Sequence, residues 1–426
     1  MSLLIEHARL LDPATGLDQV GPVCVQGSEF LAIGQIPEGF EPRRRLDAAG
    51  LWLFPGLVDL AAHLREPGEE HKATIASETL AAAHGGITTV VMPPSTDPPV
   101  DSPAEVELIT RRAEQACGVR VLTLGALTQG LRGEHLAEMG ALQRAGVVGV
   151  SHGWRPLANP LVLRRALEYA ATFDLLVQLN TQDPALTGAG CMHEGRVSTR
   201  LGLPGIPEAA ETAALGLIIA LAQQTQARIH VGRLSTARGA AMIMKAQQDG
   251  LSISADVAAH QLFLTEMDVA DFNPLCHVMP PLRTQRDRDG LRTAVADGHI
   301  MAICSDHQPH EPDSKLGPFA QTSPGISALE TLLPLTLRLV EEGLLDVHQA
   351  LARVSTGPSD LLGLSQGRLA CGHPADFVLY DPDADTAITP NTWLSTGQNT
   401  PFFGWHFSGA VQSTWVAGRP AWMRPD

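Results

Sequence analysis

Cysteine is scarce in this sequence. The six cysteines, at positions 24, 117, 191, 276, 304 and 371, are scattered, and no two of them form a Cys-x-x-Cys motif. This spacing excludes a zinc ribbon and gives no basis for a disulfide framework. We therefore expect a protein of a reducing compartment, the cytoplasm.

Long apolar runs and positive charge are also in short supply. No uninterrupted apolar stretch of about 18 residues occurs, which excludes a membrane-spanning helix. The first residues, Met1 to His7, lack the basic start and apolar core of a signal peptide. The 30 Lys and Arg stand against 46 Asp and Glu, a formal net charge of -16, which argues against binding to nucleic acid or to an anionic membrane.

What the sequence does contain is a regular alternation of strand and helix patterns. Short apolar runs predict strands at Ile87–Met92, Val119–Leu124, Leu175–Leu179, Arg228–Val231, Ser252–Val257 and Ile300–Cys304. Helical periodicity appears at Pro160–Thr172, Glu211–Gln224, Ala237–Gln248 and Ser327–Glu342. Roughly eight such alternations over about 300 residues predict an α/β fold built as a (β/α)8 barrel.

Both ends of the chain have a different pattern. Residues 3–10, 22–26 and 30–34 resemble short strands separated by turns, and residues 376–382 and 412–418 resume that style. We predict one small β-sandwich domain from residues 1–52 plus 365–426, and a barrel over residues 53–364. A doubly wound sheet is the alternative, but no Gly-x-Gly-x-x-Gly follows an early strand to support it.

Polar residues follow several of the predicted strands, where a barrel of this type carries its chemistry. His63, His152, His230, His260, Asp306 and His307 could be assembled into a metal site. The spacing gives this metal site little support, because no His-x-His pair occurs. Only Asp306 and His307 are adjacent, and adjacent residues of a strand point to opposite faces. A lone histidine at a strand end is more often a hydrogen-bonded structural residue. Ser-His-Asp catalysis has still less support, since no Gly-x-Ser-x-Gly elbow is present.

Several longer segments resemble the dihydroorotases of the amidohydrolase superfamily over nearly the whole chain. They are Asp59–Gly68, Gly85–Pro93, Arg164–Ala170, His193–Gly195, Leu201–Pro207, Pro280–Arg283, Ser305–His310 with Lys315, Pro324–Ser327 and Asn399–Gly404. The resemblance implies a metal-bearing (β/α)8 barrel with a small β domain built from both termini. It also implies opening or closure of the dihydroorotate ring at one or two zinc ions.

The resemblance implies six metal-ligand positions, and this sequence keeps two of them. His63 is the second histidine of the family's His-x-His motif, and Asp306 is the aspartate that binds metal and acts as general base. The other four positions carry Ala61, Gly153, Asn180 and Arg233, none of which is a normal zinc ligand. We therefore expect no bound zinc.

The residues implied to hold the substrate are partly kept. Arg65 and His310 match family residues that contact the substrate's carboxylate and ring. The family's Met-Pro-Asn becomes Met92-Pro93-Pro94, and the asparagine before Pro-Pro-Leu-Arg becomes Met279. Two polar contacts to a polar ring are thereby lost.

Arg233 does more than remove a ligand. A guanidinium stays protonated and cannot bind a metal, and it would repel one by several kcal/mol in a small cavity at an effective dielectric of about 20. Asp306 still needs a compensating charge in a buried position. We predict that Arg233 pairs with Asp306 within about 6 Å, directly or through one water.

Two interpretations from different classes remain. In the first, the chain is a non-catalytic dihydroorotase-like subunit that associates with aspartate carbamoyltransferase in pyrimidine biosynthesis, as a hetero-oligomer and possibly also a homo-oligomer. That partner is implied by the resemblance alone. In the second, it is an active zinc-dependent dihydroorotase or related cyclic amidase. Its mononuclear site would use His63, Asp306 and either His152 or His260.

Overall fold

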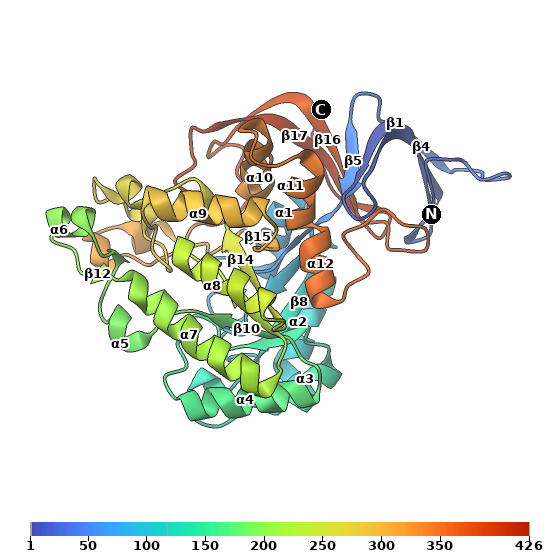
Figure 1. Ribbon diagram of the computed structural model, residues 1–426. Coiled ribbons are helices and arrows are strands. Elements are labelled where there is room, and N and C mark those ends of the chain that lie inside the picture. The colour runs from blue at the N-terminus through green and yellow to red at the C-terminus, as the bar shows by residue number, and fades with distance from the viewer. Residues whose placement is uncertain (1, 117, 426) are drawn as a thin grey trace.

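A parallel barrel forms the larger part of this computed structural model, which describes residues 2–116 and 118–425 (Figure 1). The neighbouring strands follow one another around the barrel in chain order: β6 (Leu57–Asp59), β7 (Ile87–Met92), β8 (Arg120–Ala126), β9 (Gly149–Ser151), β10 (Val177–Asn180), β13 (Ile229–Gly232), β14 (Ile253–Ala258) and β15 (Ala302–Cys304). β7 is buried along its whole length, as expected for a parallel strand covered on both faces.

The barrel closes between the segments that follow its first and last strands. Ala62 and His307 form a parallel bridge, in which the amide of His63 donates to the carbonyl of His307 at 2.9 Å. The buried Asp59 accepts hydrogen bonds from the amide of Ser305 at 2.8 Å and from its hydroxyl. These contacts fix the chain on both sides of Asp306.

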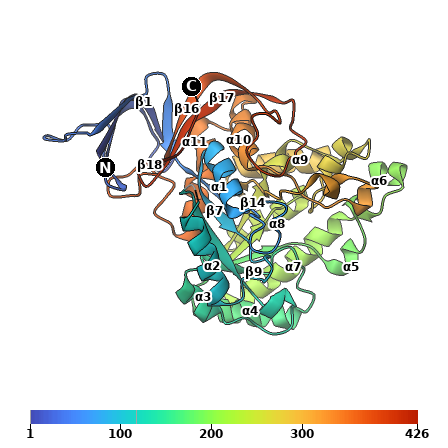
Figure 2. The same ribbon diagram turned by 180° about the vertical axis from the view of Figure 1, so that it is seen from behind.

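Helices that alternate with the barrel strands along the chain pack around the outside of the barrel (Figures 1 and 2). They are α1 (Ile75–His84), α2 (Pro103–Glu114), α3 (Met139–Ala145), α4 (Pro160–Thr172), α7 (Glu208–Thr225), α8 (Ala237–Gln248), α9 (Gln285–Ala296), α10 (Leu332–Glu341), α11 (Val347–Val354) and α12 (Thr356–Leu362). The side chain of Asn159 caps α4 by accepting from the amide of Leu161, and Pro160 opens the helix. Its buried residues recur at helical spacing: Leu163, Ala166, Leu167 and Ala170.

Short elements occupy the loops at the carboxyl ends of the strands. They are η1 (Gln129–Leu131), α5 (Pro184–Thr187), β11 (Met192–His193), α6 (Arg196–Leu201), β12 (Gly205–Ile206), η2 (Ala259–Leu262), η3 (Glu266–Val269), η4 (Pro274–Cys276), η5 (Pro312–Lys315), η6 (Phe319–Gln321) and η7 (Leu329–Thr331). β11 and β12 pair with each other in a separate parallel ribbon.

The two ends of the chain meet in one eight-stranded sheet beside the barrel, the terminal sheet (Figure 1). Its strands are β1 (Ser2–Asp12), β2 (Leu17–Gln26), β3 (Glu29–Ile33), β4 (Arg44–Asp47), β5 (Trp52–Pro55), β16 (Phe377–Ala387), β17 (His406–Val416) and β18 (Arg419–Met423). Its core includes Phe377 stacked on Trp415, with ring centres 5.5 Å apart. The boundary that we propose between residues 52 and 53 falls inside β5, which pairs with β1 up to Leu53 and with β16 up to Pro55.

The predicted α/β fold, a (β/α)8 barrel with a small β-sandwich domain formed by both termini, is confirmed, and the strands of the β domain form one continuous eight-stranded sheet. The structure gives the helices Pro160–Thr172 and Ala237–Gln248 the bounds that the sequence predicts. Within the described residues, no disulfide links Cys24, Cys191, Cys276, Cys304 or Cys371, and Cys117 lies outside those residues. Within residues 2–116 and 118–425, no helix combines the length and apolarity needed to cross a membrane.

Candidate functional site

The predicted site residues gather at the carboxyl ends of the barrel strands. His63 follows β6, Asn180 ends β10, Arg233 follows β13 and Asp306 follows β15. Trp154 joins them from the loop after β9, and we call these five residues the central cluster. Arg233 and Asp306 are only 5% and 2% exposed, so their charges interact away from bulk water.

Asp306 and Arg233 form the ion pair that the sequence predicts. Nε of Arg233 lies 3.8 Å from Oδ1 of Asp306, well inside the expected separation. That Nε has no hydrogen-bond partner among the described residues, so the contact is electrostatic. The side-chain Nε2 of Gln308 donates to the same carboxylate oxygen at 3.3 Å. Burial raises the pKa of Asp306 to about 8, although the charge of Arg233 opposes that rise.

Arg233 is held in this position by three further contacts. A terminal NH2 group of its guanidinium donates to Oδ1 of Asn180. Its guanidinium carbon lies 4.2 Å from the ring centre of Trp154, a cation–π geometry. Its backbone amide donates to Oδ1 of Asp256 at 2.6 Å, with φ at 58°. A permanent cation is therefore anchored beside Asp306.

Trp154 also determines the state of His63. The indole Nε1 lies 2.8 Å from Nε2 of His63, and an indole nitrogen can only donate. Nε2 must therefore be the accepting, unprotonated nitrogen of the ring. Burial, together with the charges of Arg65 and Arg233, lowers the pKa of His63 well below its usual value. His63 is a neutral imidazole whose Nε2 lone pair is already used.

Ala61 and Gly153 occupy the two other positions at which the resemblance implies metal ligands, and their surroundings differ. Ala61 is 2% exposed and belongs to an apolar cluster inside the barrel, with Leu60, Val91 and Cys304 among its members. Gly153 has a φ of 62°, and a Cβ built on it would collide with Oγ of Ser95. A carboxylate side chain at position 153 therefore does not fit unless Ser95 moves.

The donors that remain do not form a metal site. Within residues 2–116 and 118–425, no group of three His, Cys, Asp or Glu side chains is arranged to hold a metal ion. His152 and His260 therefore do not complete a mononuclear site with His63 and Asp306. His152 lies 3.5 Å from the hydroxyl of Thr128, and burial lowers the pKa of His260 to about 3.

His230 and His307 have structural partners. His230 lies between Asp256, at 2.9 Å from Nε2, and Ser254, at 2.8 Å from Nδ1. Nε2 of His307 lies 2.8 Å from the buried carboxylate of Glu78, and its Nδ1 accepts from the amide of Ala328 at 3.0 Å. Both rings use both nitrogens, as expected of hydrogen-bonded structural histidines.

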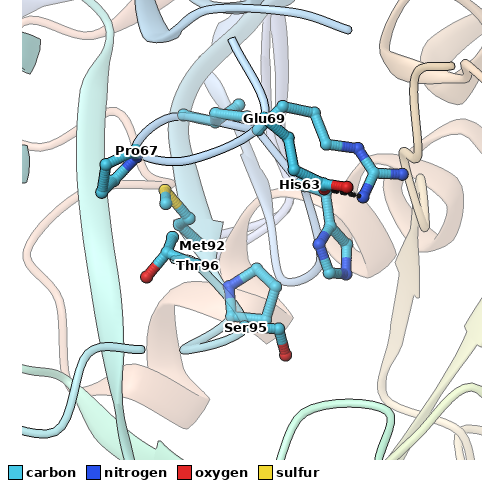
Figure 3. A pocket seen from close by; sticks show the side chains of 9 residues that line it. His63, Pro67, Glu69, Met92, Ser95 and Thr96 are labelled. Atoms are coloured by element: carbon cyan, nitrogen blue, oxygen red, sulfur yellow. Dashed lines mark hydrogen bonds and ion pairs between the residues drawn. The ribbon is translucent and has the colours of Figure 1, made fainter. Parts of the chain in front are cut away.

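Arg65 lines a small pocket with an empty volume of about 240 Å3, part of it open to solvent, and His310 lies against Arg65 outside that lining. Figure 3 shows His63, Glu69 and Ser95 in the wall of the same pocket. Arg65 donates to Glu69 at 2.8 Å and to the carbonyl of Pro309 at 3.0 Å, and its NH2 lies 3.1 Å from Nε2 of His310. Glu69 therefore compensates the positive charge of Arg65, the residue that the resemblance implies contacts a substrate carboxylate. Burial and the charge of Arg65 lower the pKa of His310 to about 3.

Sequence reasoning missed Trp154, Asp256 and Glu78. Trp154 directly follows a lost ligand position, so an aromatic side chain there was the available signal. Asp256 and Glu78 lie inside a predicted strand and on a helix, and no motif marked them. Their roles depend on contacts from distant strands, which one sequence does not show.

This chain is similar to known proteins in sequence and in fold. Residues 50–239 match the family described as Dihydro-orotase-like, and residues 289–421 match the Amidohydrolase family. A dihydroorotase-like protein of Pseudomonas putida is 50% identical over 418 residues, covering 98% of each chain. The dihydroorotase of Syntrophotalea carbinolica is 40% identical over 426 residues, covering 100% of each.

Among solved structures, an L-hydantoinase from Arthrobacter aurescens has a TM-score of 0.87 at 22% identity. The match covers 98% of this chain and 95% of that one. A dihydropyrimidinase from Brevibacillus agri has a TM-score of 0.85 at 22% identity, with 99% and 95% covered. At these identities the likeness establishes the fold alone.

Proposed function

Because this chain belongs to the dihydroorotase-like family of amidohydrolases, we propose that it is a non-catalytic subunit that supports the assembly of aspartate carbamoyltransferase in pyrimidine biosynthesis. The proposed complex is a hetero-oligomer, in which this chain also self-associates, and its proposed location is the cytoplasm. The choice of the transferase as partner rests on the family resemblance alone.

The observation that carries the non-catalytic part is the Arg233 guanidinium 3.8 Å from Asp306. A zinc hydrolase needs three protein ligands and an open position at which bound water becomes acidic. Here Nε2 of His63 accepts a hydrogen bond from Trp154, and Asp306 lies beside the guanidinium of Arg233. Neither side chain is prepared to activate water, and zinc does not fit the donors present.

Co-expression with the aspartate carbamoyltransferase of the same organism, followed by gel filtration, tests the partner. We expect one high-mass complex containing both chains, and a transferase that is less stable or less active when expressed alone. Separate elution, with full transferase activity in the absence of this chain, would contradict the proposal.

The barrel's catalytic residues are not needed for this role. We therefore expect Asp306→Asn, which retains the side-chain shape, to join the complex as the wild type does. Dihydroorotate turnover by the complex that disappears in Asp306→Asn would instead indicate an active cyclic amidase.

A further inference from the structure

Ser254, His230 and Asp256 form a hydrogen-bonded line inside the barrel, outside the central cluster. Oγ of Ser254 lies 2.8 Å from Nδ1 of His230, and Nε2 of His230 lies 2.9 Å from Oδ2 of Asp256. His230 in β13 is paired in register with Ser254 in β14, and residues 254 and 256 share a face of β14. A hydroxyl, an imidazole and a carboxylate in this order are the parts of an activated serine nucleophile, which geometry identifies where a sequence motif does not.

The protonation states also fit a nucleophile. Burial tends to raise the pKa of Asp256, but the hydrogen bond from His230 and the charge of Arg233 lower it overall, so Asp256 is a carboxylate at neutral pH. A carboxylate only accepts, so Nε2 of His230 carries the hydrogen, and in the neutral ring Nδ1 accepts from the hydroxyl of Ser254. The carbonyl of Ile229, a second acceptor near that hydroxyl, lies farther away at 3.5 Å.

A cavity at the amino ends of the barrel strands gives access to Ser254. Its lining residues precede or begin strands such as β13 and β14, so we call it the basal cavity. Its volume is about 220 Å3, below the range of about 300–1,000 Å3 typical of drug-sized ligands. The lining residues that keep exposed surface are Arg228, Leu251, Ser252 and Ser254. The basal cavity therefore suits a small polar molecule, which meets the serine while His230 stays buried.

Arg228 supplies a positive charge in the same cavity. It directly precedes β13 and lies two residues before His230, on the same face of the strand. Its guanidinium is held by the carbonyls of Asp174 at 3.3 Å and Leu361 at 3.2 Å, and its ion pair with the exposed Asp174 carboxylate is a weak surface contact. A cation held in place stabilises the oxyanion that forms when a hydroxyl attacks a carbonyl.

We propose that Ser254 is the nucleophile of a second reaction centre, which hydrolyses small acyl esters in the basal cavity with His230 as general base. Asp256 positions the ring of His230. The Ser254 oxygen bonds to the ester carbonyl carbon while its proton passes to Nδ1 of His230; the ester C–O bond then breaks, and the leaving alkoxide takes that proton. Water repeats these steps on the acyl-serine, which releases the carboxylic acid and restores the hydroxyl. This centre does not depend on the proposed partner.

Methanesulfonyl fluoride is a small probe that tests the nucleophile directly on the full chain. Attack by Ser254 forms an O–S bond and expels fluoride, while the proton passes to His230. We expect peptide mass spectrometry to locate the methanesulfonyl group on Ser254 in the folded chain and not in the urea-unfolded chain. His230→Gln should slow this labelling about 100-fold, and Ser254→Ala should lower the hydrolysis of 4-nitrophenyl acetate by a similar factor.

The ring of His230 gives a second measurement that does not depend on reactivity. In nitrogen-15 NMR we expect the hydrogen on Nε2, with the signals assigned by their loss in His230→Gln. The side-chain amide of Asp256→Asn can donate to Nε2, so this variant should move the hydrogen to Nδ1 and slow labelling of Ser254 at least tenfold. The change of tautomer distinguishes positioning of the ring from a loss of fold.

Ser28→Ala alters an exposed serine in the turn between β2 and β3, and it should be labelled on Ser254 as the wild type is. Three results would each overturn the proposal. They are an unlabelled Ser254 in the folded chain, a wild-type His230 with its hydrogen on Nδ1, and unchanged ester hydrolysis by Ser254→Ala.

Discussion

Arg233 shows how a single residue type changes what a barrel mouth can do. Its guanidinium contacts Asp306, Asn180 and Trp154 while its own backbone is held at a φ of 58°. Asp306 and Arg65 also have positive φ, of 50° and 64°. Such strained backbone is typical of active sites, and the central cluster combines it with side chains that form no group of three metal donors among the described residues.

Removing the cation should expose the dependence of Asp306 on it. Arg233→Met leaves the Asp306 carboxylate buried near the negative Asp256, and we expect a loss of about 2–4 kcal/mol in unfolding free energy at a pH above 8, where Asp306 with its pKa of about 8 is ionised. The double variant Arg233→Met/Asp306→Leu should recover most of that loss, because it leaves no unpaired charge. Urea denaturation of the four proteins in the cycle measures the coupling. Additive effects within about 0.5 kcal/mol would show that the pair does not interact.

At the scale of elements, the predictions succeeded where local signals suffice. Helix α4 has Asn159 and Pro160 at its start, and α8 has Thr236 as its cap, so periodicity and capping agree. The predicted helix Ser327–Glu342 starts later, at Leu332. The amide of Ala328 instead donates to His307, a residue of the segment after β15, and the local sequence cannot indicate this contact.

The central cluster was predictable only in part for the same reason. The sequence alone shows that the implied ligand positions carry residues other than normal zinc ligands, and that one of them, Arg233, is a cation. The position of Trp154 over His63 depends on how the loop after β9 folds back across the barrel mouth. A side-chain contact between residues 91 positions apart requires the tertiary structure.

The closure of the barrel leads to a prediction about Ser305, which directly follows β15. Ser305 supplies two of the donors to the fully buried Asp59, whose pKa burial raises. Ser305→Ala removes the hydroxyl donor and should lower the unfolding free energy by about 1–3 kcal/mol. The exposed Ser28 offers a matched control, and Ser28→Ala should change it by less than about 0.5 kcal/mol. Equal effects of the two substitutions would contradict the role of Asp59 in closing the barrel.

At the scale of the whole molecule, the terminal sheet and the barrel are joined by specific contacts. The hydroxyl of Thr414 in β17 donates to the carbonyl of Ala83 in α1 at 2.6 Å, and Arg120 of β8 pairs with Asp376. The two chain ends therefore stabilise the barrel from one side, and the central cluster lies at the carboxyl ends of its strands.

Buried neutral histidines should make this molecule sensitive to acid. Burial lowers the pKa of His260 to about 3, far below its value in the unfolded chain of about 6.5. Its contribution to stability is full above pH 6.5 and is lost as pH falls toward 3, by about 1.4 kcal/mol per pH unit. His260→Gln cannot take up this proton. The variant should therefore lose less stability than the wild type between pH 6.5 and pH 5 in urea denaturation. Parallel pH curves for the two proteins would contradict a neutral buried His260.

The central claim is that the family's metal chemistry is absent from this chain, and the zinc content of the purified protein tests it most directly. Elemental analysis after zinc exposure and gel filtration, with a dihydroorotate turnover assay on the same sample, makes the measurement. We predict zinc far below one ion per chain and no turnover. Stoichiometric zinc, with turnover that Asp306→Ala abolishes, would contradict the account.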